Sequence, residues 1–507
     1  MKFGCAIKTV LLCALGLLAA SLPARELPPL VPPPQPVVIP VPAAQTLPNG
    51  LTVLVLERHT LPVVTLNLAI KAGAEADPPG LPGAAQLVAS LLDEGTEDRG
   101  AQQIAEAIDD AGGSIDVGAE WDDSYASLSV LSDHTQLAFN LLSDMAIHPA
   151  FSAEEVKRIR KQTLSALDIL RHDPGYLADT LFERMVFWGT PYSHPANGVE
   201  ESIRRITSRD LRRFHDTYYR PSNAALVVVG DIASSQAFAL ARQFFGGWKA
   251  SPRSPAVKVL PNRRGSPPAS ANHPNGQAAR QVVVIDDPAA VQTEIRIGNT
   301  AIRRASPDYA ALTVANQVLG GPAVNLLFSV LRSRHGLVYG ASSDIVSYRN
   351  GGAWEAKTST RTAQTSKAVE LILDQMKNLR DRSLSSMDLS MAQDYLIGHM
   401  ALDFESSQEV AQQLLELLVY NLPLDYWSHF PGEVRGLTRD EVRMATRRYL
   451  DPQHSVIVLV GNAQDFKDNL KSLGNVRIIP MANVDLASAT LERPETQIAT
   501  TDSTRHK

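Results

Sequence analysis

The chain has 507 residues, of which 44% are hydrophobic and 20% are charged, and its net charge at pH 7 is −6. These proportions are typical of a soluble globular protein, and the length exceeds one compact core, so two or more domains are expected. The slight negative charge offers no polycationic surface, which argues against nucleic acid as a partner.

The first 24 residues predict a signal peptide for export. Two lysines precede an apolar run over residues 10–18, and small residues follow it. The run is too short for a permanent anchor, and no later stretch reaches about 18 uninterrupted apolar residues. We therefore expect a periplasmic or secreted protein without a stable membrane span. Both cysteines, Cys5 and Cys13, lie in this signal, so we expect no disulfide, thiolate ligand or cysteine nucleophile in the mature chain.

Composition divides the remainder into two halves with connecting segments. Residues 25–45 are rich in proline and predict an extended spacer. Residues 251–282 combine Pro, Arg, Ser, Gly and Asn with few apolar residues and predict a linker. Residues 483–507 lack a periodic apolar pattern and predict a disordered tail. The two predicted domains are therefore residues 46–250 and residues 283–482.

Each half mixes predicted strands with long predicted helices. In the first half, residues 51–56 and 63–70 predict strands and residues 152–171 predict a helix, and residues 365–379 predict a helix in the second half. The acidic run at residues 120–123 (Glu-Trp-Asp-Asp) predicts a solvated turn rather than a metal site.

The two halves also share a repeated block. Residues 203–232 align without a gap to residues 434–463, and the matching pairs are Thr207 and Thr438, Arg212 and Arg443, Tyr218 and Tyr449, Pro221 and Pro452, and Gly230 and Gly461. Each copy predicts a helix capped by threonine, a proline turn and a buried strand that ends in Val-Gly. The repeat indicates duplication, and the mixture of elements favours an α+β fold with helices packed on a largely antiparallel sheet in each domain.

Residues 319–339 predict a helix followed by a strand. Two glycines and a proline open the stretch, apolar residues recur at helical spacing, Gly336 ends the helix, and residues 337–339 begin a strand. This order brings the guanidinium of Arg332 near the phenol of Tyr339. Both are donors suited to an oxygen that becomes negative during acyl transfer. The alternative is a solvated helix charge and a core tyrosine whose hydroxyl is paired.

Taken together, several motifs resemble those of the pitrilysin/insulinase family of inverted zinc peptidases. The motifs are Leu47-Pro48-Asn49-Gly50-Leu51, Gly80-Leu81 through Gly95-Thr96, Phe187-Trp188-Gly189-Thr190-Pro191-Tyr192, Tyr219-Arg220-Pro221-Ser222-Asn223, Leu319-Gly320-Gly321, and Leu331-Arg332 with Gly336-Leu337-Val338-Tyr339. The resemblance covers nearly all of residues 46–480. It implies two homologous domains that form one half of a clam shell.

The zinc site of that family is missing from the sequence. Catalytic members carry H-x-x-E-H on a helix just before a Gly-Thr pair, so that two histidines one turn apart bind zinc, the glutamate polarises the bound water and a distant glutamate completes the site. The resemblance places Gln86, Leu87, Val88, Ala89 and Ser90 at the motif and Ala166 at the distant ligand. Zinc sites use imidazole, thiolate and carboxylate. We therefore assign this chain no metal and no cofactor, and expect its helix to be a core element.

The family's Arg/Tyr pair is present at Arg332 and Tyr339. In catalytic relatives this pair is thought to contact the substrate carbonyl, so the resemblance implies that the chain acts in trans. It would be the non-catalytic subunit of a heterodimeric or larger zinc metalloendopeptidase that degrades peptides, with zinc in a homologous partner that carries H-x-x-E-H. One alternative is a catalytically dead scaffold or peptide-binding protein of the same fold. A self-sufficient zinc protease with unorthodox ligands is the third and least favoured possibility.

Overall fold

A computed structural model of the chain describes residues 39–249, 280–322, 325–488 and 490–493. These residues all belong to one compact unit, Pro36–Lys507. The predicted signal peptide, most of the predicted spacer and nearly all of the predicted linker lie outside the described residues. Among the described residues, no helix combines the length and apolar character needed to cross a bilayer.

The first half builds a six-stranded sheet in the order β1-β2-β6-β3-β5-β4. Its strands are β1 (Ala43–Thr46), β2 (Thr52–Glu57), β3 (Val63–Ile70), β4 (Ser114–Ala119), β5 (Ser124–Leu131) and β6 (Ala224–Gly230). Strands β2 and β6 run parallel, and the other neighbours are antiparallel. The predicted strands at residues 51–56 and 63–70 are confirmed as β2 and β3.

The second half builds a matching six-stranded sheet in the order β12-β7-β11-β8-β10-β9. Its strands are β7 (Gln281–Asp286), β8 (Gln292–Thr300), β9 (Val338–Ser347), β10 (Gly352–Arg361), β11 (Val456–Gly461) and β12 (Asn475–Pro480). Strand β7 runs parallel to β11 and β12, and the other neighbours are antiparallel. Five strands follow the same order in both sheets, β2-β6-β3-β5-β4 and β7-β11-β8-β10-β9, whereas the sixth, outer strand comes from the start of the first half and from the end of the second. These two mostly antiparallel sheets confirm the predicted α+β fold and its duplication.

Helices connect the strands in both halves. Those of the first half are α2 (Ala84–Ala89), α3 (Ala101–Asp110), α4 (Thr135–Ile147), α5 (Ala153–Leu170), α6 (Pro174–Val186), α7 (Glu200–Arg205), α8 (Ser208–Tyr218) and α9 (Ser234–Phe245). Those of the second half are α10 (Tyr309–Leu319), α11 (Thr365–Asp381), α12 (Ser386–Asp403), α13 (Ser407–Val419), α14 (Tyr426–Gly436) and α15 (Arg439–Tyr449). The long predicted helices are confirmed as α5 and α11.

The repeated block folds in the same way in both halves. The hydroxyl of Thr207 accepts a hydrogen bond from the backbone N–H of Asp210 at the start of α8, and Thr438 does the same for Glu441 at the start of α15. These caps satisfy backbone donors that the first helical turn leaves without a partner. The strands that follow, β6 and β11, are buried along their whole length, as the pattern predicts.

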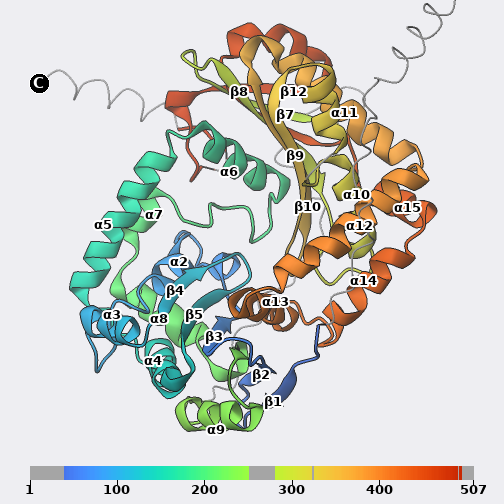
Figure 1. Ribbon diagram of the computed structural model, residues 1–507. Coiled ribbons are helices and arrows are strands. Elements are labelled where there is room, and N and C mark those ends of the chain that lie inside the picture. The colour runs from blue at the N-terminus through green and yellow to red at the C-terminus, as the bar shows by residue number, and fades with distance from the viewer. Residues whose placement is uncertain (1–38, 250–279, 323–324, 489, 494–507) are drawn as a thin grey trace, which may run out of the picture. The chain divides into compact units, whose positions relative to one another are not determined.

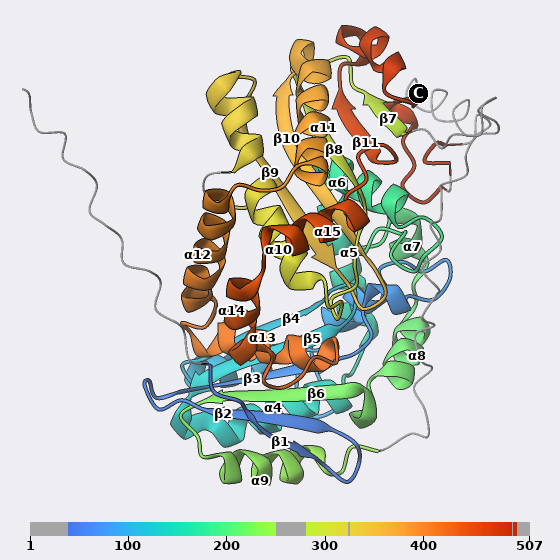
Figure 2. The ribbon, with the colours of Figure 1, turned by 90° about the vertical axis from the view of Figure 1, so that its right-hand side faces the viewer.

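Each sheet has one face covered by helices of its own half and receives a helix of the other half on the opposite face. Helices α4 and α9 lie below the first sheet in Figure 2, whereas α13, from the second half, lies above it and contacts β3 and β6. Correspondingly, α6 from the first half contacts β8 and β11 of the second sheet (Figure 1). Apolar side chains of α13 such as Leu414 share one core cluster with Val227 of β6.

The run at residues 120–123 is not a solvated turn, and that prediction is wrong. Asp122 and Asp123 are only 1% and 8% exposed. The backbone N–H of Arg349, which follows β9, donates to Asp122 Oδ2 at 2.7 Å, and its Nη1 donates to Glu75 Oε1 at 3.0 Å. The positive charge next to these buried carboxylates therefore belongs to Arg349, which lies in the other half of the sequence. A local sequence pattern could not reveal it.

Part of the predicted disordered tail is folded. Val484 and Glu492 form a β-bridge, Leu491 is 4% exposed, and the carbonyl of Ser488 accepts a hydrogen bond from Nη2 of Arg184 on α6 at 3.0 Å. The physical reason is that α6, which packs on the sheet of the other half and is called the exchanged helix below, has apolar side chains that Leu491 packs against. Residues 494–507 lie outside the described part of the chain.

Candidate functional site

Arg332 and Tyr339 lie on either side of a glycine that ends a short helix. The helix Phe328–Arg334 is wound as a π-helix, and β9 begins at Val338. Between them Gly336 has φ of +63°, a left-handed conformation that favours glycine and closes helices. The predicted sequence of helix, glycine and strand is therefore confirmed, although the winding of the helix was not anticipated.

The two side chains stack at the edge of the second sheet. Cζ of Arg332 lies 4.6 Å from the ring centroid of Tyr339 and 5.1 Å from that of Phe328. Nη1 of Arg332 donates to the carbonyl of Tyr339 at 2.5 Å. Tyr339 is 85% exposed, and within the described residues neither its hydroxyl nor the Nε and Nη2 donors of Arg332 has another hydrogen-bond partner. A guanidinium and a phenol thus both offer donors to solvent at one strand edge.

The segment that precedes this helix is fixed by close backbone contacts. The carbonyl of Gly320 accepts a hydrogen bond from the backbone N–H of Ser343 on β9 at 2.8 Å. A Cβ at Gly320 would lie 2.2 Å from that nitrogen, so only glycine allows the approach. Asn325 donates to the carbonyl of Gly321 at 2.7 Å and accepts from the N–H of Phe328 at 2.7 Å, and so caps the helix that carries Arg332.

A groove of about 580 Å³ runs beside this segment. Its walls are strands β8, β9 and β10, residues 320–322, Asn325 and Phe328, and Tyr339 lies on its rim. The charged side chains that line it are Glu294, Arg296, Asp344 and Lys357. The groove therefore leads from the exposed Tyr339 to a polar floor.

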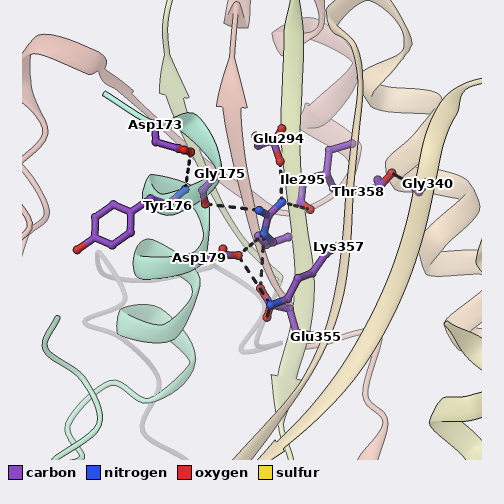
Figure 3. A network of polar contacts seen from close by, with 11 residues as sticks. Asp173, Gly175, Tyr176, Asp179, Glu294, Ile295, Gly340, Glu355, Lys357 and Thr358 are labelled. Atoms are coloured by element: carbon purple, nitrogen blue, oxygen red, sulfur yellow. Dashed lines mark hydrogen bonds and ion pairs between the residues drawn. The ribbon is translucent and has the colours of Figure 1, made fainter. Parts of the chain in front are cut away.

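The floor of the groove is held by a charged network centred on Arg296, which is 6% exposed. Its Nε donates to Asp179 Oδ1 of the exchanged helix α6 at 2.5 Å, and its Nη1 donates to Glu294 Oε2 at 3.0 Å. Nζ of Lys357 lies 3.1 Å from Glu355 Oε2. Figure 3 shows Asp179, Glu294, Glu355 and Lys357 converging between α6 and the strands. The network links the groove to the helix that comes from the other half.

The network makes stability dependent on pH through Glu355. Burial raises its pKa from 4.5 to about 7; Asp179 also raises it, whereas Lys357 and Arg296 lower it. A carboxyl whose pKa is higher in the folded state stabilises that state below pH 4.5, and this contribution is lost as the pH rises through 7. We expect the melting temperature of the wild-type chain to fall more steeply between pH 5 and pH 8 than that of Glu355→Gln. The exposed Glu370→Gln is the control, and equal slopes for Glu355→Gln and wild type would contradict the assignment.

The positions of the missing zinc motif lie on α2 and at its C-cap, Ser90, and their side chains serve the fold. Leu87, Val88 and Ala89 are 0–3% exposed, which confirms that this helix is a core element. Nε2 of Gln86 donates to Ser90 Oγ at 3.2 Å, and its Oε1 accepts from the backbone N–H of Ala119 at 3.1 Å. The amide thereby ties α2 to the end of edge strand β4.

These donors do not fit a zinc ion. One amide, one hydroxyl and an alanine provide neither imidazole nor carboxylate, and Ala166 is an exposed residue of α5. Over residues 39–249, 280–322, 325–488 and 490–493, no three His, Cys, Asp or Glu side chains are arranged to hold a metal ion.

Several groups around the donor pair were not predicted from the sequence. Arg296 and Glu294 alternate with Thr293, Ile295 and Ile297 along β8, and a charged residue at every second position is a signal that one face of the strand is polar. Glu355 and Lys357 alternate with Trp354 and Ala356 along β10 and give the same signal. The partner on α6 gave none, because the sequence does not show that α6 crosses to the other sheet.

Comparison with known families identifies both halves. Residues 52–195 match the family described as Insulinase (Peptidase family M16), and residues 205–396 match the family described as Peptidase M16 inactive domain. An uncharacterized zinc protease of Mycobacterium leprae is 24% identical over 415 residues, which cover 82% of this chain and 90% of the relative. A non-peptidase homolog of Helicobacter pylori is 23% identical over 416 residues, covering 81% and 92%.

Solved structures share the fold over most of the chain. A peptidase M16 inactive domain from Pseudomonas fluorescens has a TM-score of 0.74 and 28% identity, and covers 83% of this chain and 97% of its own. A protease from Helicobacter pylori has a TM-score of 0.73 at 19% identity and covers 85% and 100%. The second likeness concerns the fold alone.

Proposed function

Because the chain belongs to the pitrilysin/insulinase family, peptidase family M16, as an inactive-type member, we propose that it is the subunit that donates Arg332 and Tyr339 to a heteromeric zinc metalloendopeptidase. A homologous partner with H-x-x-E-H would supply the zinc and the general base, and the complex would degrade peptides. The observation that carries the proposal is the contrast between the two sites: the zinc positions hold Gln86 and Ser90, whereas the donor pair is stacked, exposed and supported.

The role proposed for the pair follows from its chemistry. A carbonyl oxygen that gains negative charge during peptide hydrolysis is stabilised by donors already oriented toward it. Arg332 contributes a permanent positive charge and Tyr339 a neutral hydroxyl, and both stand at a strand edge where an extended peptide can approach. The export pattern in residues 1–24 supports a location outside the cytoplasm for the complex.

The proposal is tested with the purified full chain and its partner. We expect the chain alone to contain no stoichiometric zinc by elemental analysis and to leave an unstructured peptide intact. Addition of a co-purifying homologue that carries H-x-x-E-H should produce cleavage above the level of that homologue alone. Stoichiometric zinc in the isolated chain, or cleavage by it unaided, would refute the proposal.

A second function is a scaffold or peptide-holding protein that takes part in no hydrolysis. The relative named a non-peptidase homolog supports this reading. It predicts that no zinc peptidase co-purifies with the chain and that peptides bind to the chain without any rise in cleavage above that of an added homologue alone. The two functions therefore differ in two measurable outcomes, which are co-purification of a zinc peptidase and increased cleavage on mixing.

A further inference from the structure

Strand β9 contains a β-bulge where Tyr339 leaves the sheet. Val338 pairs with Thr360 and Ala341 pairs with Thr358, so three steps along β9 match two steps along β10. In a regular strand, residues three apart face opposite sides. Here Val338 and Ala341 are each 8% exposed and belong to the same core cluster. The extra residue lets both face the core while Tyr339 turns outward to Arg332.

A bulge removes backbone carbonyls from the regular ladder, and two buried threonines of β10 compensate for this loss. Oγ1 of Thr358 donates to the carbonyl of Gly340 at 2.6 Å, and Oγ1 of Thr360 donates to the carbonyl of Leu337 at 2.8 Å. Their exposed fractions are 6% and 3%. Figure 3 shows Thr358 directed at Gly340. The carbonyls of Val338 and Tyr339 lie between these two, and Arg332 donates to that of Tyr339.

We infer that Thr358 and Thr360 are positioning residues for the Arg332/Tyr339 pair, an inference that rests on the proposed function. Their hydroxyls fix the carbonyls on either side of Tyr339, which sets the direction of the phenol and the place of the carbonyl on which the guanidinium is anchored. Neither threonine is required to touch a peptide. Their effect would be on the orientation of the donors, and a small displacement of an oriented group has a large effect on rate.

The test uses valine and serine variants of the full chain in the reconstituted complex. Valine keeps the shape of threonine and removes the hydroxyl, whereas serine keeps the hydroxyl. We expect Thr358→Val with Thr360→Val to lower kcat by roughly ten- to a hundredfold, with KM changed by about twofold or less. The double serine variant should retain turnover. A purely structural role would lower the melting temperature of the valine variant and leave kcat at 25 °C unchanged, and that result would overturn the inference.

Thr293 provides a matched control. It lies on β8 opposite Thr360 and is 0% exposed, and within the described part of the chain its hydroxyl has no hydrogen-bond partner. Thr293→Val removes a buried hydroxyl from the same sheet without touching the bulge, so turnover should be unchanged. A fall equal to that of the double valine variant would overturn the inference.

A second readout needs no partner. With 3-fluorotyrosine placed at position 339 of the isolated chain, the ¹⁹F signal should move toward that of an unstructured peptide in the double valine variant and remain in place in the serine and Thr293→Val variants. An unmoved signal in the double valine variant would overturn the inference. If Arg332→Ala and Tyr339→Phe lower turnover but the valine variants do not, the positioning role of the threonines is wrong and the proposed function stands. If Arg332→Ala and Tyr339→Phe change nothing, the proposed function itself is wrong.

Discussion

Replacement of Arg332 by alanine is expected to lower kcat of the reconstituted peptidase by about 10²–10³, the effect of removing one oriented donor from an oxyanion site. Tyr339→Phe, which removes only the hydroxyl, should have an effect of the same order. Neither change should disturb folding, because Arg332 is exposed and Tyr339 is 85% exposed. The measurement is kcat for cleavage of one defined peptide at saturating concentration. Assembly of the complex is checked by size-exclusion chromatography.

Arg334 is the control for the charge of this helix. It is an exposed arginine two residues further along the same helix, and Arg334→Ala should leave kcat within about twofold of wild type, since long-range charge at an exposed site is screened. If Arg332→Ala behaves like Arg334→Ala, the donor role is excluded and only a general effect of positive charge remains.

The largest loss of stability is expected for Arg304→Ala. This guanidinium is 2% exposed, donates through Nε to Glu416 Oε1 at 2.6 Å and through Nη1 to the hydroxyl of Tyr426 at 3.0 Å. Its Cζ lies 3.9 Å from the ring centroid of Tyr309. Removing one partner of a buried ion pair typically costs about 3–5 kcal/mol, and because the side chain of Glu416 is 26% exposed we expect a loss near the lower end of that range. Chemical denaturation of the chain measures the change in the free energy of unfolding.

Arg303, the exposed neighbour of Arg304, gives the matched substitution. Arg303→Ala should change the free energy of unfolding by about 0.5 kcal/mol or less, as is usual for an exposed side chain. A loss below about 1 kcal/mol for Arg304→Ala would mean that neither its ion pair nor its stacking on the aromatic rings carries the stability of this region, because the substitution removes both.

Local patterns were sufficient for the elements of the fold. The Thr207 and Thr438 caps, the strands β2 and β3 and the ungapped repeat depend on residues that are near in sequence, and each is found in the structure. Residues 120–123 were mispredicted because Asp122 accepts a hydrogen bond from the backbone N–H of Arg349, 227 residues away, and the charge of Arg349 lowers the pKa of this buried carboxyl against the effect of burial. A rule that reads an acidic run as solvated fails when the opposite charge is supplied by another part of the chain.

The candidate site, too, could be predicted only where it depends on residues that are near in sequence. Gly336 between a helix and a strand was enough to predict that Arg332 and Tyr339 lie together. In the structure the guanidinium of Arg332 stacks on the ring of Tyr339. The bulge that turns Tyr339 outward depends on pairing with β10, and register between strands is not contained in the sequence of one strand. Their roles in peptide cleavage stay predictions.

The exchange of α6 and α13 has a consequence for how the molecule can move and unfold. A helix of each half packs on the sheet of the other, so the two halves are interlocked. Separating them would expose apolar surface on both sheets to water. Heating should therefore melt them in a single cooperative transition, and fragments made by cutting the gene between the repeats should be insoluble unless produced together. Any relative movement of the two halves must therefore come from flexing around these exchanged helices.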